Sequence, residues 1–169
     1  MNEEALIERI EDWAKSTPAP LRTSDSRTLS PQEAKGLSCF SENLSSEGIF
    51  SSKYLRYNAD LIPLLSPEAF RRYLPNLILT GMKLSDPSVD AYDYIILMLD
   101  RSPDHDLWCE RFKERWAKLS IEQLSIIEEW LLWLSDKDEF DELSITRSFD
   151  TIGLLKEVRQ KDNSDTGSE

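Results

Sequence analysis

Few residues in this chain are of types that support catalysis or metal binding. The single histidine, His105, lies between Asp104 and Asp106, and Glu110 follows. One imidazole and three carboxylates are ligand types that bind a divalent metal, so one hypothesis is a metal-assisted hydrolase. Adjacent residues point to different sides of a helix, however, and acidic residues at a helix start stabilise the helix dipole. We therefore favour a capping role for this cluster and expect no bound metal.

The two cysteines also lack the pattern of a reactive site. Cys39 and Cys109 lie far apart in the chain, without the short spacing of zinc or redox motifs, which indicates reduced cytoplasmic thiols. His105 precedes Cys109 by four residues, a spacing that lets two side chains touch on one helical face. Because no cation adjoins Cys109 in the sequence to stabilise a thiolate, we expect an inert thiol. Glycine-rich phosphate-binding motifs are absent from the sequence, so we predict no cofactor and no enzymatic activity.

Charge is distributed unevenly along the chain. Twenty Lys and Arg residues oppose 32 Asp and Glu, for a net charge of −12. Residues 1–85 carry 11 acids and 10 bases, whereas residues 86–169 carry 21 acids and 10 bases. Such a negative potential repels nucleic acid and anionic lipid and attracts basic proteins. With no apolar run near the roughly 20 residues that span a bilayer, and an acidic start in place of a signal peptide, we expect a cytoplasmic protein that binds neither membrane nor nucleic acid.

The densest acidic segment supplies the candidate binding surface. We predict that a basic partner binds five carboxylates and one neighbouring aromatic residue, namely Asp136, Asp138, Glu139, Asp141, Glu142 and Trp133. A second charged segment lies upstream, where basic residues occur near tyrosines: Lys53, Arg56, Arg71 and Arg72 with Tyr54, Tyr57 and Tyr73. For that segment we favour ordinary surface ion pairs, such as Glu68 with Arg72 at a spacing of four residues.

Helical periodicity and start signals describe most of the chain. Ser30-Pro31 with Glu33, Ser66-Pro67, and Ser120 with Gln123 are typical N-terminal caps. The expected helices cover 4–15, a short segment from 31, 67–81, 87–99, 103–119, 121–134 and 143–158, and residues 45–65 fit helix and irregular structure alike. Pro75 should kink or break its helix. We predict an all-α fold: a compact single-domain bundle of about six or seven helices over 1–160, with a disordered polar tail at 161–169.

One segment resembles a known sequence signature. Ser66 to Pro75 reads S-P-E-A-F-R-R-Y-L-P, which is similar to the S-P-E-A-F-R-x-Y-L-P pattern of a small bacterial domain-of-unknown-function family. The resemblance covers roughly residues 4–135. Arg72 stands where the family has an aromatic residue, and the acidic C-terminal extension is outside the pattern. The resemblance implies bacterial origin and a helical fold, and it assigns no activity.

These features favour a non-enzymatic protein-binding module. The specific hypothesis is an immunity or antitoxin-like inhibitor that neutralises a basic, nucleic-acid-degrading toxin by covering it with an acidic surface. Two alternatives are the hydrolase at Asp104, His105 and Asp106, and a structural adaptor that oligomerises through an apolar stripe. For the inhibitor we expect a monomer or a weak dimer.

Overall fold

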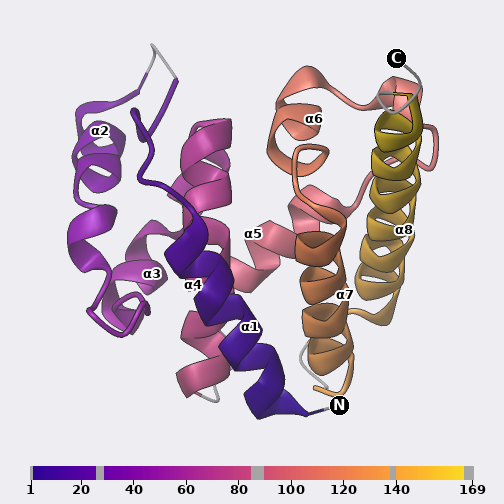
Figure 1. Cartoon of the computed structure of the whole chain (residues 1–169). Helices are drawn as coiled ribbons and strands as arrows, with labels where there is room; N and C mark the ends of the chain where they lie inside the picture. The colour runs from indigo at the N-terminus through magenta and orange to yellow at the C-terminus, as the bar shows by residue number, and fades with distance from the viewer. Residues whose placement is uncertain (1, 26–28, 85–89, 138–139, 166–169) are drawn as a thin grey trace. The chain divides into compact units, whose positions relative to one another are not determined.

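The protein is all-α (Figure 1). The computed structural model describes residues 2–25, 29–84, 90–137 and 140–165. Within these ranges there are eight α-helices and three 3-10 helices, and the only β-type pairing is an isolated bridge between Leu44 and Phe50. Contacts divide the chain into two units, Asn2–Ile95 and the part from Ile96 onward. The predicted single domain over 1–160 depends on how these units associate and stays a prediction.

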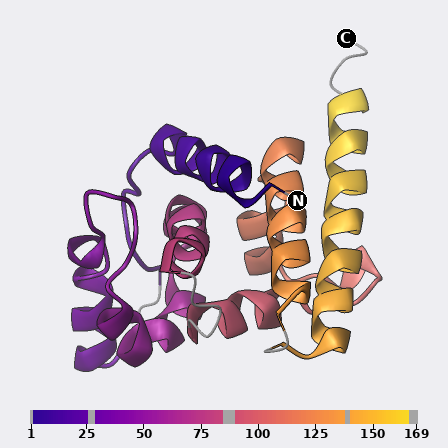
Figure 2. The same cartoon turned by 90° about the horizontal axis from the view of Figure 1, so that it is seen from below.

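The first unit is built around one long, buried helix. Its elements are α1 (Glu3–Ser16), α2 (Pro31–Ser38), η1 (Ser41–Asn43), α3 (Ser52–Asn58), η2 (Ala59–Leu64), α4 (Pro67–Leu84) and the start of α5 (Asp90–Leu99). Helix α1 packs against α4 (Figures 1 and 2). From Tyr73 to Met82 every residue of α4 is buried, so this helix forms the core of the unit. The predicted helix over 87–99 is described only from Asp90.

Side-chain caps begin three of these helices, and those at Ser30 and Ser66 were predicted. Asn2 accepts a hydrogen bond from the Ala5 amide at 3.4 Å, and Ser30 and Glu33 form a complete capping box at α2. Ser66 is buried, and its hydroxyl accepts from the Ala69 amide at 3.1 Å. Each cap satisfies an amide that the first helical turn leaves without an intrahelical acceptor.

Pro75 does not break α4. The helix runs past it to Leu84, three residues beyond the predicted end, so the break is wrong, whereas the kink stays a prediction. Proline removes one backbone donor and crowds the preceding turn. Leu74, Leu77 and Ile78 are fully buried around it, and this apolar burial offsets the cost of continuing the helix.

The second unit contains an antiparallel helical hairpin. Its elements are η3 (His105–Leu107), α6 (Glu110–Trp116), α7 (Ile121–Ser135) and α8 (Glu142–Asp165). Helices α7 and α8 lie side by side (Figures 1 and 2). The predicted capping box of Ser120 and Gln123 begins α7. As predicted, the helices leave out most described residues of the charged segment 136–142, since α7 ends at Ser135 and α8 begins at Glu142; these residues are Asp136, Lys137, Phe140 and Asp141.

Three boundaries in this unit differ from the prediction, and one of them is the end of α6 at Trp116 in place of residue 119. The helix expected from residue 103 begins only at Glu110, because the Asp104 side chain accepts from the Asp106 amide and caps a 3-10 turn instead. Helix α8 continues through Lys161 to Asp165, where a disordered tail was expected; residues 166–169 lie outside the described ranges. No helix within the described ranges combines the length and apolar character that crossing a bilayer requires.

Candidate functional site

The predicted acidic surface lies at the closed end of the α7–α8 hairpin. Asp136 is the C-cap of α7, and Asp141 and Glu142 begin α8; all three are exposed. Asp138 and Glu139 lie outside the described residues. We call the following five residues the acidic end: Asp136, Asp141 and Glu142, together with the exposed leucines Leu132 and Leu143.

Asp136 adds negative charge to a helix terminus that is already negative. The C-terminal carbonyls of a helix carry a partial negative charge, which basic side chains normally complement. The last turn of α7 contains no basic residue, and Asp136 places a carboxylate at its cap. Lys137 follows, with its ammonium 4.8 Å from the centre of the Trp133 ring.

Asp141 has a structural role as well as a charge. Its Oδ2 accepts from the Ser144 backbone amide and from the Ser144 hydroxyl, each at 2.9 Å. These hydrogen bonds lower the pKa of Asp141, with the backbone bond as the larger cause. Glu142 lies in the first turn of α8, where a carboxylate complements the helix dipole. Both residues therefore stabilise α8, and both side chains remain exposed.

The aromatic contact predicted at Trp133 is not available on the surface. Trp133 is only 3% exposed. Two leucines that the prediction omitted are exposed instead: Leu132 on α7 by 48% and Leu143 on α8 by 56%. The sequence could have indicated Leu132, because it is not among the buried residues of its helix, which are Leu124, Ile126, Ile127, Trp130, Leu131, Trp133 and Leu134. Exposed leucines and exposed carboxylates therefore occur at the same two helix ends, which is a mixed apolar and acidic composition.

The residues of the metal-site hypothesis do not form a ligand set. The Nδ1 atom of His105 lies 3.1 Å from an oxygen of Asp106, and Asp104 caps η3. Among the described residues, no group of three or more His, Cys, Asp or Glu side chains is placed to hold a metal ion. His105 and Cys109 do not share a helix, because His105 belongs to η3 and Cys109 is the N-cap of α6.

His105 instead lines an open cleft of about 310 Å³. Trp108 and Val158 contribute apolar walls, and Lys113, Lys161 and Asp162 contribute charges. The His105 and Trp108 rings meet edge to face, with centroids 6.2 Å apart. The extension of α8 beyond Val158 brings Lys161 and Asp162 to this cleft, which is why sequence periodicity alone missed it.

The predicted ion pair between Glu68 and Arg72 is wrong. Glu68 accepts a hydrogen bond from the Leu21 amide at 3.3 Å. Arg72 donates from Nη1 to the Ala14 carbonyl and to Asn76 Oδ1, each at 3.1 Å. Arg72 thus joins α4 to the C-terminal turn of α1 and lines a cleft in the first unit.

No family model, curated protein or solved structure matches this chain. The resemblance of Ser66–Pro75 to a bacterial family stays a prediction.

Proposed function

We propose that this protein is a non-enzymatic binding module that holds a basic protein at the acidic end of the α7–α8 hairpin. The observation that carries the proposal is the exposure of Leu132 and Leu143 at the two helix ends that carry Asp136, Asp141 and Glu142. Contact of leucine side chains with water is unfavourable, so their burial by a partner contributes favourable free energy of binding. The carboxylates select a partner that is positively charged.

The charge of the second unit supports the same proposal. Residues 96–169 carry 18 acids and 10 bases, against 14 acids and 10 bases in residues 2–95. A negative field of this kind speeds the encounter with a basic protein and orients it before contact. The leucines then supply the short-range contacts that the long-range field cannot.

Occlusion is the mechanism that we propose for such a complex. A partner that binds phosphate uses Lys and Arg side chains, and the carboxylates of the acidic end compete for the same cations. Inhibition of a basic, nucleic-acid-degrading toxin is the specific form of this proposal. It requires no reactive group on this chain, because the partner's own binding surface is covered.

Site-specific photo-crosslinking tests the proposal. A photoreactive amino acid at position 143 should give an adduct with a basic protein in the cells that naturally produce this chain. The matched control is the same photoreactive residue at Leu21, which is 92% exposed and lies in the first unit. The adduct from position 143 should weaken as salt increases, because exposed charges are screened.

Three outcomes would contradict the proposal. One is an equal adduct pattern from positions 21 and 143, which would mean nonspecific capture. The second is an adduct that salt does not weaken. The third is a homodimeric adduct from position 143, which would favour the structural-adaptor alternative.

A further inference from the structure

A cleft of about 360 Å³ opens in the first unit, away from the acidic segment of the sequence. Its walls come from α1, from α4 and from the loop of residues 44–48. The volume lies within the range of about 300–1,000 Å³ that is common for small-molecule sites. Leu44, Ala14 and Leu79 line it together with charged and amide side chains, so its wall combines apolar and polar surface.

Arg72 is the polar group of this cleft that has no counter-charge. It is half-buried, and among the described residues no carboxylate lies within ion-pair distance of its guanidinium. Both protons of Nη1 are used, one by the Ala14 carbonyl and one by Asn76. The Nε and Nη2 donors have no acceptor among the described residues. Half-buried charges are normally paired, so this free edge favours a ligand.

The surrounding hydrogen bonds hold this arginine in place. Asn76 is 2% exposed; it accepts from Arg72 and donates to the Gly48 carbonyl at 2.9 Å. Gly48 has a φ of 76°, a left-handed conformation that favours glycine and shapes the loop over the cleft. The arginine, the loop and the end of α1 are therefore connected through one buried amide. A pre-ordered site of this kind loses little entropy when a ligand binds.

Three cations line the cleft against two carboxylates, which leaves one net positive charge: Lys15, Arg72 and Lys83 oppose Glu11 and Glu47. Lys83 lies 2.6 Å from Glu11 and donates to the Glu47 carbonyl at 3.1 Å. Lys15 also approaches Glu11, at 3.8 Å, and is 71% exposed, so it can turn toward a bound anion. Since Lys83 and Glu11 neutralise each other, the field within the cleft favours an anion close to Arg72.

We infer that this cleft binds a small organic carboxylate through the free edge of Arg72. The parallel Nε and Nη2 donors of an arginine match the two oxygens of a carboxylate. The apolar wall of Leu44 and Leu79 suits the carbon chain of such a ligand better than it suits inorganic phosphate. This site lies in a different unit from the acidic end and does not depend on the proposed function.

A titration followed by two-dimensional amide NMR tests the inference with succinate as the probe. Succinate should shift the amide signals of Ser45 to Gly48 and of Ala14 in a saturable way at constant ionic strength. Arg72→Gln should weaken this binding at least tenfold. Arg72→Lys should also weaken succinate binding, because lysine keeps the positive charge but lacks the two parallel N–H donors of arginine. Uncharged succinamide should give no saturable shift.

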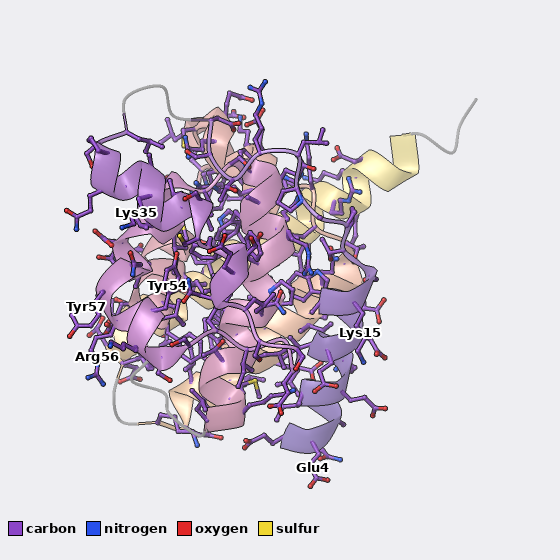
Figure 3. The ribbon with its side chains drawn as sticks, turned by 90° about the vertical axis from the view of Figure 1, so that its left-hand side faces the viewer. Glu4, Lys15, Lys35, Tyr54, Arg56 and Tyr57 are labelled. Carbon is purple, nitrogen blue, oxygen red and sulfur yellow. The ribbon has the colours of Figure 1, made fainter. Side chains whose placement is uncertain are left out.

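Arg56→Gln is the matched control. Arg56 is exposed on α3, and Figure 3 shows it with Tyr57 at the opposite edge of this face from Lys15. The control should bind succinate as the unchanged protein does. The inference is overturned if succinate gives no saturable shift, if Arg56→Gln weakens binding as much as Arg72→Gln, or if phosphate binds and succinate does not. If the Arg72→Gln protein does not fold, as judged from its NMR spectrum, the Arg72→Lys variant serves as the test. Unchanged succinate binding by Arg72→Lys would overturn the inference.

Discussion

The Lys83 ammonium on α4 lies 2.6 Å from the Glu11 carboxylate on α1. Both side chains are partly shielded from water, with exposures of 23% and 32%. Their hydrogen bond is the largest cause of a lowered pKa at Glu11, and the charge of Lys83 adds to it. One ion pair thus links the packing of two helices to the shape of the cleft beside Arg72.

Replacing Lys83 should destabilise the protein more than replacing the other lysine near Glu11. We expect Lys83→Met to lower the free energy of unfolding by about 1 kcal/mol, as is typical of partly shielded pairs. Lys15→Met should cost less, because Lys15 is 71% exposed and lies 3.8 Å from Glu11. Urea denaturation of both variants makes the comparison. Equal losses would contradict the importance of the Lys83 pair.

The same pair predicts a pH dependence. The folded pKa of Glu11 lies below its ordinary value of 4.5, so the folded state favours the carboxylate. This contribution is fully present above pH 4.5 and is lost as the pH falls through the folded pKa. Glu11→Gln should therefore reduce the loss of stability below pH 4.5. Parallel acid profiles of the two proteins would contradict this prediction.

Two glycines in helices should respond to alanine in opposite directions. A Cβ added at Gly81 would overlap the ring and hydroxyl of Tyr92, which is fully buried and donates to the Ile78 carbonyl. We expect Gly81→Ala to cost about 1–3 kcal/mol through overpacking. At Gly153 an added Cβ meets nothing within 4 Å, so Gly153→Ala should stabilise α8 by roughly 0.5–1 kcal/mol. Chemical denaturation measures the change in the free energy of unfolding for both variants. Destabilisation by Gly153→Ala would contradict the described packing.

Burial of Tyr54 predicts sensitivity to alkali. Its hydroxyl donates to the Gly36 carbonyl at 2.9 Å, and desolvation raises the pKa of this phenol well above 10.0. A raised pKa favours the neutral form in the folded state, so its contribution is complete below pH 10 and is lost as the pH rises toward the folded value. Tyr54→Phe should flatten the alkaline limb of the stability profile and cost about 1 kcal/mol near neutral pH. An unchanged alkaline limb would count against the burial of the hydroxyl.

Local signals predicted the helix starts well. Serine followed three residues later by Glu or Gln is a pattern read within a single turn, and both capping boxes form as expected. Within the helix predicted over 103–119, Trp108, Phe112 and Trp116 recur at a spacing of four residues, and all three are buried. The helix itself begins only at Glu110, because apolar spacing reports which side chains are buried and not where the backbone bonds begin.

Features that depend on tertiary contacts could not be predicted locally. The Glu68–Arg72 pair has the right spacing, yet Arg72 instead bonds to the Ala14 carbonyl, which is 58 positions away in the chain. Trp133 was predicted as a contact residue from its place near a helix end, but it is buried. The gap between the helices predicted over 121–134 and 143–158 was located to within one residue on each side, because like charges disfavour a helix interior without reference to the rest of the fold.

The central claim is tested most directly by the dissociation constant of the non-covalent complex between this protein and the basic partner that photo-crosslinking identifies. Asp136→Lys should raise this constant at least tenfold at low salt, because a repulsive charge replaces the carboxylate at the end of α7. Glu8→Lys, at an exposed position of α1, makes the same change in net charge and should alter it less than twofold. Equal effects of the two substitutions, or no effect of Asp136→Lys, would contradict binding at the acidic end.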